Sequence, residues 1–425
     1  MGLMRMLGNM ITPEQLVESV AGRNLCMAYV QEFGKDDETS AADEFRRFLS
    51  GVSLIEGASD QGRASFGWDE SGKPLSGNEL VMAVESSLVD QGVNFANLPG
   101  AVARKLDEFD LDAMPTGAAG RDLLRAALTR AVDELHLWGQ PLDAEERIAA
   151  SAPVRAALVR VAAHILASKG AAGWDRPHDS ARQMVVYFPG RNETPAPKRK
   201  WWQKKSETPA QELRARPCDA AAITQILADD AAENAEAEAR DSEFRRTHPD
   251  REYSGNWWSV PPFALTRSTR PTDLGTPSFL HYEEDSFGDE QALSWCVKPH
   301  NLNIYEVAAA GDWADLCAKY PRTMTSQTWY MWAENTGRTG EWVIPAWELM
   351  ARDYDGIHLT TSAYLEMTGA AVPVPHLGNA GQWASTLAGW SPDITYYFAP
   401  ISVDEDSRQE WHRDEDGQWQ PGAGR

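Results

Sequence analysis

The chain has 425 residues, 42% of them hydrophobic, and a formal net charge of −23. This length allows about two or three domains, and the apolar fraction allows a packed core, which excludes a chain that is disordered throughout. The negative field makes nucleic-acid binding unlikely, because it repels a phosphate backbone. One basic cluster opposes that field, at Lys198, Arg199, Lys200, Lys204 and Lys205.

The cysteines and the apolar runs indicate the compartment. The four cysteines form no C-x-x-C pair, so zinc-ribbon and dithiol redox motifs are absent. Their spacing is typical of free thiols in a reducing compartment, with a disulfide between Cys296 and Cys317 as the alternative. Residues 1–10 lack the apolar core of a signal peptide, and no run of about 18 apolar residues indicates a transmembrane helix. We expect a soluble, cytoplasmic protein.

The first part of the chain, residues 1–188, is predicted to be a helical domain. Thr12 is a capping residue, with Pro13 at the first helical position and Gln15 three residues after the cap. Apolar residues recur at helical spacing over 121–137 and 153–168, and Asp143 is a plausible cap for a short helix between them. Residues 57–78 read as a loop, with a hairpin at 66–73 as the alternative. Amphipathic helices of this kind pack as a bundle.

A linker and a connecting helix follow. A short β-like run at 184–188 precedes a stretch from 189 to 218 in which prolines and lysines concentrate, which predicts a basic linker. A helical connector is expected over 219–252. Its first half is apolar, whereas its second half is rich in alanine and glutamate and is expected to face solvent.

The character of the sequence changes over 253–402, because twelve of the 17 tryptophans lie beyond residue 250. Short β-like runs alternate there with helical stretches, a pattern typical of an α+β domain. Residues 403–425 are predicted to be an acidic polar tail, in which Asp416 and Gly417 could close a hairpin. The predicted fold class is therefore α+β, with an N-terminal helical bundle and a C-terminal mixed α+β domain.

The stretch from Trp257 to Phe398 contains a set of short motifs. They are Trp257-Trp258-Ser259, Glu284-Asp285-Ser286, Tyr305-Glu306-Val307, Asp312-Trp313-Ala314, Ile344-Pro345, Tyr354-Asp355-Gly356 and Gly389-Trp390-Ser391-Pro392-Asp393. On these residues the stretch, about a third of the chain, resembles a domain type of uncharacterised actinobacterial proteins. That type has no assigned activity, so the resemblance implies a folded domain and no mechanism.

Three separated polar segments form the pattern that most resembles an active site. Arg267-Ser268-Thr269-Arg270 and Thr360-Thr361-Ser362 each follow a strand-like run, and Asp393 or the group Asp404, Glu405 and Asp406 comes later. This order resembles arginine–Ser/Thr-Ser–glutamate ADP-ribosyltransferases, and the resemblance implies NAD as cofactor. Arg267 or Arg270 would grip its pyrophosphate. Thr360, Thr361 and Ser362 would support the nicotinamide pocket, and Asp393 would stabilise positive charge on the ribose.

The sequence departs from that family at its carboxylate. No Glu-x-Glu or Gln-x-Glu turn lies between Ser362 and Pro400, and Asp393 is one methylene shorter than the glutamate it would replace. The structural alternative places Arg267 and Arg270 in ion pairs and Thr360 to Ser362 at the cap of a helix over 363–367.

Other candidate sites have simple alternatives. P-loop, Rossmann, nucleophile-elbow, metalloprotease and kinase motifs are absent. His281 with Glu283, Glu284 and Asp285 could hold a divalent cation, but a solvated charged loop is the more frequent arrangement, and we predict no metal site. His358, on an otherwise apolar strand, is expected to be a hydrogen-bonded core histidine rather than a base.

The tryptophans support a second functional hypothesis. Trp329, Trp332, Trp342 and Trp347 could line a groove, although clustered tryptophans are more often core. Trp201 and Trp202 lie among the linker lysines and could contact an anionic membrane face or a partner chain. A non-catalytic interaction protein is therefore the alternative to the transferase.

Overall fold

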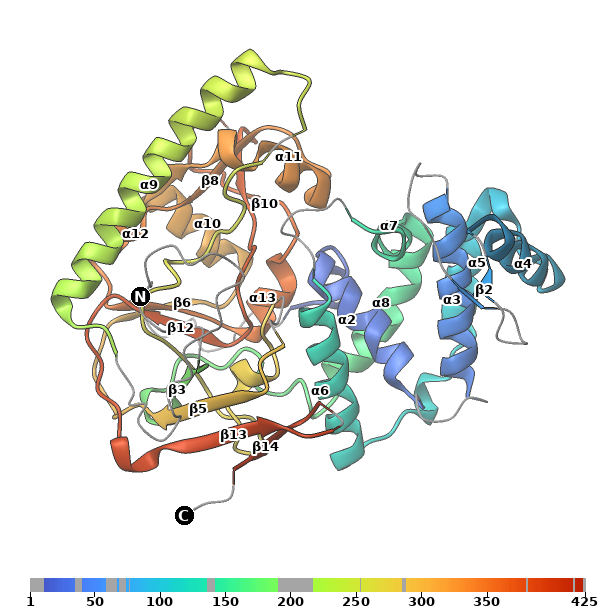
Figure 1. The fold of residues 1–425 in the computed structure, drawn as a ribbon, viewed down its shortest axis with the longest axis horizontal. Helices are drawn as coiled ribbons and strands as arrows, with labels where there is room; N and C mark the ends of the chain where they lie inside the picture. The colour runs from blue at the N-terminus through green and yellow to red at the C-terminus, as the bar shows by residue number, and fades with distance from the viewer. Residues whose placement is uncertain are drawn as a thin grey trace.

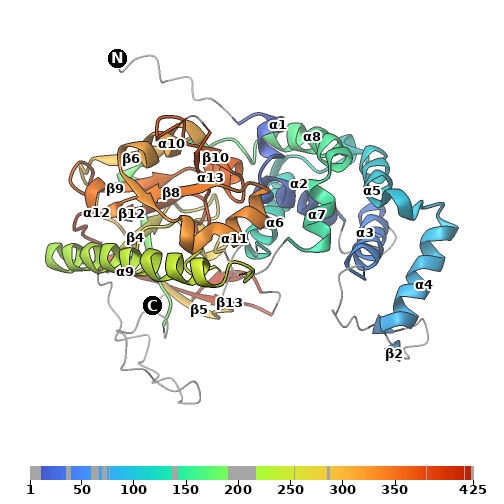
Figure 2. The same ribbon diagram turned by 90° about the horizontal axis from the view of Figure 1, so that it is seen from above.

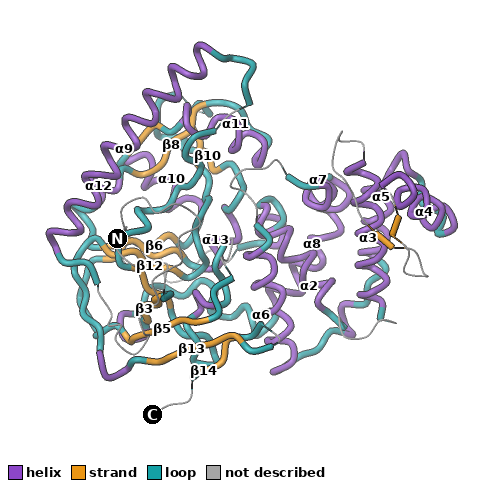
Figure 3. Tube along the Cα trace, viewed as in Figure 1, coloured by secondary structure: helices purple, strands orange, loops and turns teal. Residues whose placement is uncertain are grey.

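A computed structural model describes residues 11–34, 40–58, 67–68, 74–75, 77–135, 142–189, 217–252, 254–284, 288–379, 381–415 and 417–422. Helices lie mainly in the N-terminal half and strands mainly in the C-terminal half, as Figure 1 and Figure 3 show. The predicted α+β class is therefore confirmed.

The N-terminal half is built from helices. They are α1 (Pro13–Leu16), α2 (Val20–Glu32), α3 (Ala41–Ala58), α4 (Gly77–Asp90), α5 (Leu98–Asp107), α6 (Gly117–Asp133), α7 (Ala144–Ala150) and α8 (Ala152–Ala167). Buried apolar faces on α2, α6 and α8 form the centre of this bundle. Helix α4 lies at its far end (Figure 2).

Local capping signals set several boundaries in this half. Thr12 and Gln15 form a capping box on α1, with Pro13 at the first helical position, as predicted. Asp143 caps α7 through a second capping box with Glu146. Strands β1 (Gly67–Trp68) and β2 (Pro74–Leu75) pair in antiparallel fashion, which agrees with the hairpin alternative for this region.

Helix length and hydropathy bear on membrane insertion. Among the described residues, no single helix is long and apolar enough to cross a bilayer; the adjoining α7 and α8, bent by 80°, pass that test only as a pair.

The main sheet contains eight strands within the described part of the chain, in the order β14-β13-β5-β3-β4-β12-β9-β6. Their bounds are β3 (Met184–Tyr187), β4 (Arg267–Thr269), β5 (Gln291–Cys296), β6 (Ile304–Val307), β9 (Gly356–Leu359), β12 (Ile394–Tyr397), β13 (Gln409–Arg413) and β14 (Trp419–Pro421). Strands β6 and β9 pair in parallel and the other neighbours are antiparallel. Every residue of β9 and β12 is buried, so both faces of the sheet are covered there.

Strand β3 does not follow the predicted division of the chain. The sequence places residues 184–188 at the end of the helical domain, yet β3 lies between β4 and β5 in the sheet. Val185 and Tyr187 pack against the cluster of Leu293, Trp295 and Val403, which accounts for the placement. The sheet therefore includes chain from both sides of the predicted linker, of which residues 190–216 lie outside the described residues.

The described part of the predicted polar tail, residues 403–415 and 417–422, is not simply a tail. Strand β13 pairs with β5 and β14 pairs with β13, so this segment forms one edge of the main sheet. Trp411 and Trp419 are buried, and the Trp411 indole donates to Ser294 Oγ at 2.8 Å. The acidic composition misled the prediction, because these two tryptophans anchor the segment.

A smaller sheet, together with the helices next to it, holds four of the eight tryptophans that are buried among the described residues: Trp313, Trp332, Trp342 and Trp347. Its strands, in spatial order, are β10 (Val372–Pro373), β11 (Trp383–Ser385), β8 (Glu341–Pro345) and β7 (Pro321–Thr323). Helices α10 (Ala310–Lys319) and α11 (Thr325–Thr336) pack against it, and α12 (Trp347–Met350) directly follows β8. Trp332, Trp342 and Trp347 are fully buried, as the core interpretation predicted, whereas Trp329 is half-buried beneath Arg245.

The connecting helix is α9 (Ala220–Thr247), and its second half is not wholly solvent-facing as predicted. Asn234, Ala237 and Asp241 are buried against the α11 region. Glu238 accepts hydrogen bonds from the backbone N–H groups of Ser326 (2.9 Å) and Gln327 (3.3 Å) in the first turn of α11. A carboxylate at that position satisfies free donors and complements the helix dipole.

The helical half and the sheet share one continuous core. Helix α13 (Thr361–Met367) packs on α2, and the carbonyl of Thr368 accepts from the N–H groups of Val20 (3.1 Å) and Ala21 (3.3 Å). Ser19 Oγ also donates to the carbonyl of Leu365. This junction, seen between α2, α6 and α13 in Figure 1, positions the candidate site.

Candidate functional site

A cavity of about 310 Å³ lies at the junction between the helical half and the main sheet. Its walls come from α6, from the turn after α8, and from the segments that flank β4, β12 and α13. Arg270, Thr361 and Asp393, three of the residues predicted from the sequence, line it. We call it the junction pocket.

Arg270 and Asp393 are joined to each other within this pocket. Arg270 Nε donates to Asp393 Oδ1 at 2.9 Å and to Oδ2 at 3.1 Å, and Nη2 also donates to Oδ1. Their side chains are 11% and 9% exposed. Arg270 follows β4 and Asp393 precedes β12, just beyond the paired residues Thr269 and Ile394, so the sheet register brings the two together.

Asp393 has an unusual backbone conformation. Its φ is 57°, and it is the only non-glycine residue with positive φ among those that the structure describes. Aspartate tolerates this left-handed conformation better than most residues, but the geometry is uncommon. It orients the carboxylate toward two cationic groups at once, which is a reason for such a conformation to be kept.

His358 contacts Asp393 and also a second carboxylate, that of Glu306. Its Nδ1 lies 2.7 Å from Glu306 Oε2 and its Nε2 lies 3.2 Å from Asp393 Oδ1. Burial disfavours the charged ring, but the two carboxylates outweigh it and raise the pKa of His358 to about 9. The pKa of Asp393, which burial alone would raise, is lowered by His358 and Arg270. His358 is thus a hydrogen-bonded core histidine, as predicted.

His178 lies beside Glu306 and His358, and its ring remains neutral. Its backbone N–H donates to Glu306 Oε1 at 2.7 Å, and its Nδ1 lies 3.1 Å from Thr395 Oγ1. Burial, followed by the charge on His358, lowers the pKa of His178 to about 4. Its ring stacks on His300 with centroids 5.5 Å apart.

The other predicted site residues have structural contacts. The Arg267 guanidinium lies 4.6 Å from the centre of the Phe279 ring. Thr360 Oγ1 accepts from Ala363 N and caps α13, which agrees with the structural alternative. The N–H of Ser362 donates to the carbonyl of Trp174 at 3.0 Å. None of these three residues is among the described residues that line the junction pocket.

The basic residues of the junction pocket were missed by sequence reasoning. Besides Arg270 they are Arg121, Arg125, Lys169, Arg176 and Arg182. Asp273 pairs with Arg121 (3.2 Å) and Arg125 (3.3 Å). Lys169, Arg176 and Arg182 form no ion pair with any residue that the structure describes. The i, i+4 spacing of Arg121 and Arg125 was the one local signal that could have pointed to them.

Polar and aromatic groups complete the pocket. Ser278 is 5% exposed, and its Oγ is buried without a hydrogen-bond partner. Tyr282 and Trp174, both half-buried, also line the cavity. Burial raises the pKa of Tyr282, so its hydroxyl stays protonated.

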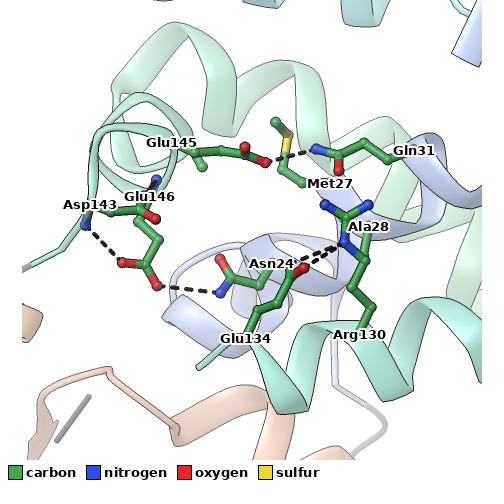
Figure 4. Close-up of a pocket in the computed structure, with 10 residues that line it drawn as sticks. Asn24, Met27, Ala28, Gln31, Arg130, Glu134, Asp143, Glu145 and Glu146 are labelled. Atoms are coloured by element: carbon green, nitrogen blue, oxygen red, sulfur yellow. Dashed lines mark hydrogen bonds and ion pairs between the residues drawn. The ribbon is translucent and has the colours of Figure 1, made fainter. Parts of the chain in front are cut away.

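A second cavity, of about 300 Å³, lies between α2, α6 and α7 and is acidic (Figure 4). Glu145 accepts from Gln31 Nε2 at 2.7 Å, and burial raises the pKa of Glu145. Glu134 is paired with Arg130 at 3.0 Å, and Glu146 accepts from the N–H of Asp143 at 3.0 Å. Because its carboxylates already have partners, we assign this cavity no ligand.

The described residues contain neither a metal-binding cluster nor a disulfide. Within them, no group of three or more His, Cys, Asp or Glu side chains is placed to hold a metal ion. His281 is half-buried near Arg125 and Arg413, and partial burial with these charges lowers its pKa to about 4. Asp285 lies outside the described residues. All four cysteines are free, so the Cys296–Cys317 disulfide is not formed.

Trp201, Trp202 and the basic cluster at 198–205 lie outside the described residues, so the partner contact expected there stays a prediction. No protein-family model, curated protein or solved structure matches this chain.

Proposed function

We propose that this protein binds a small phosphate-bearing molecule in the junction pocket. The observation that carries the proposal is a reversal of charge. The chain has a net charge of −23, yet its junction pocket is lined by six basic and two acidic side chains. A concave site of one sign concentrates ligands of the opposite sign.

The ion pairing of the basic side chains supports an anionic ligand. Arg270 is neutralised by Asp393, and Arg121 and Arg125 share Asp273. Lys169, Arg176 and Arg182 are exposed and have no ion partner within the described part of the chain. Arginine binds phosphate in a bidentate manner, and lysine adds a compact positive charge. These three side chains are the ones we assign to the phosphate.

The transferase hypothesis is supported only in part by this geometry. Arg270, Thr361 and Asp393 do line one pocket. The roles in ADP-ribosyl transfer, however, need a free arginine for the pyrophosphate and a free carboxylate for the ribose, whereas Arg270 and Asp393 bind each other. We therefore propose binding as the function, and NAD enters the test as one candidate ligand.

Thermal unfolding in the presence of ligands tests the proposal. A ligand that binds only the folded state raises the melting temperature as its concentration rises. We expect such a rise with pyrophosphate, ADP or NAD, and we expect added salt to diminish it. The double variant Arg176→Ala/Arg182→Ala should lose the rise. Arg352→Ala is the matched control, because Arg352 is exposed and lies outside the pocket.

Two results would count against the proposal. One is an unchanged melting temperature with every phosphate compound at millimolar concentration. The other is an equal rise for wild type and the double variant, which would place the anion elsewhere on the chain.

A further inference from the structure

The junction pocket offers hydrogen-bonding groups beside its charges, and they indicate what the phosphate is attached to. The inference rests on the proposed function. Ser278 Oγ is buried without a partner at the pocket wall. A buried hydroxyl without a partner is costly, and a bound ligand that supplies the missing hydrogen bond removes that cost.

Asp393 has one carboxylate oxygen with spare capacity. Its Oδ1 accepts from Arg270 Nε and Nη2 and lies 3.2 Å from His358 Nε2. Its Oδ2 accepts only from Arg270 Nε, at 3.1 Å, among the described residues. An ionised carboxylate oxygen can accept two hydrogen bonds, so Oδ2 can receive one from a ligand hydroxyl.

The remaining groups fit a ligand rich in hydroxyls. The Thr361 hydroxyl can both donate and accept, and the half-buried Trp174 presents an apolar ring. None of the described residues that line the pocket is Asn or Gln, the side chains that pair with the edge of a base. The cavity volume of about 310 Å³ is near the lower end of the usual range for ligand sites, about 300–1,000 Å³.

We infer that the ligand is a phosphorylated sugar or polyol. Its phosphate binds Lys169, Arg176 and Arg182. Its hydroxyl groups bind Ser278 Oγ, the Thr361 hydroxyl and Asp393 Oδ2. A nucleotide, whose base would need its own polar partners, is the competing ligand.

Isothermal titration at fixed ionic strength tests this assignment. The titrants are ribose 5-phosphate, glucose 6-phosphate, AMP and inorganic phosphate. For wild type we expect a sugar phosphate to bind about tenfold tighter than inorganic phosphate, the effect of one or two neutral hydrogen bonds. Ser278→Ala should lower the affinity for the sugar phosphate to about that for inorganic phosphate, because one hydroxyl contact is lost. Ser50→Ala, at an exposed serine on α3, is the control.

The outcomes separate the two proposals. If AMP binds tightest, or if inorganic phosphate binds as well as the sugar phosphates, the sugar assignment is overturned while phosphate binding stands. If no titrant binds, both proposals fail. Should Ser278→Ala prove unfolded by circular dichroism, Thr361→Val takes its place, with Thr361→Ser as the variant that restores the hydroxyl and the sugar preference. A preference that Thr361→Val leaves intact overturns the assignment.

Discussion

Arg270 and Asp393 form a buried ion pair, Nε to Oδ1 2.9 Å, across the ends of two adjacent antiparallel strands. His358 also contacts Asp393, and its ring lies between the carboxylates of Asp393 and Glu306. Positive and negative groups therefore alternate from the junction pocket into the sheet, and each has a partner of opposite sign. Such an arrangement is costly to break at one member, because a buried charge is then left alone.

Asp393→Asn should destabilise the fold strongly. The substitution keeps the size of the side chain and the tolerance for positive φ, but it removes the charge that faces Arg270 and His358. We expect a loss of about 3–5 kcal/mol in the free energy of unfolding, measured with urea. Asp353→Asn, at an ion pair with Lys319 whose side chains are half-exposed, should cost much less, because solvent screens that pair. Equal losses in the two variants would contradict the role given to the buried pair.

Stability should fall as the pH rises above neutrality. The pKa of His358 is raised to about 9 in the folded state, against about 6.5 in an unfolded chain. The contribution of a raised pKa is fully present below the unfolded value and is lost as pH rises through the folded value. It amounts to about 3 kcal/mol, lost between about pH 6.5 and 9. His358→Gln should be less stable than wild type near neutral pH and should lack this alkaline decline. A decline that persists in His358→Gln would show that another group causes it.

Stability should also fall on the acid side of neutrality. The pKa values of His178 and His281 are lowered to about 4, so the folded state resists protonation that the unfolded chain accepts. Stability from these groups is present above about pH 6.5 and is lost as pH falls toward 4. His178→Gln should reduce the slope of stability against pH in this window without abolishing it, because the pKa values of His281 and His300 are lowered as well. Circular dichroism melts at several pH values measure both slopes, and an unchanged acid slope would exclude His178 as a source.

Glu238 should stabilise the start of α11. Its carboxylate accepts from the N–H groups of Ser326 and Gln327, and loss of a capping acceptor costs about 1 kcal/mol. Glu238→Ala should therefore lower the free energy of unfolding by about that amount. Glu236→Ala, two residues earlier on the exposed side of α9, is the control and should have little effect. Similar effects at the two positions would indicate a general charge effect instead of a cap.

Helix caps and helical apolar faces could be predicted from the sequence, because a few neighbouring residues determine them. The caps at Thr12 and Asp143 and the apolar spacing along α6 and α8 depend on contacts within one or two turns. The burial of Trp332 and Trp342 was also predicted, because large apolar area is rarely left in water.

The pocket itself was only partly predictable. Arg270, Thr361 and Asp393 were selected by resemblance, and the structure brings them to one cavity. The pairing of Arg270 with Asp393 depends on which strands are neighbours, and that is a tertiary property. Lys169 and Arg176 belong to the turn after α8, far from both strands in sequence, so no local pattern could assign them to this site.

The placement of β3 has a consequence for how the chain can be divided. A fragment that begins at residue 219 would lack the strand between β4 and β5, and both would then present open hydrogen-bonding edges to other chains. Expressed alone, such a fragment should self-associate. A separate peptide containing Met184–Tyr187 should replace the missing strand by strand addition. The main sheet is therefore complete only when residues from both apparent halves of the chain are present.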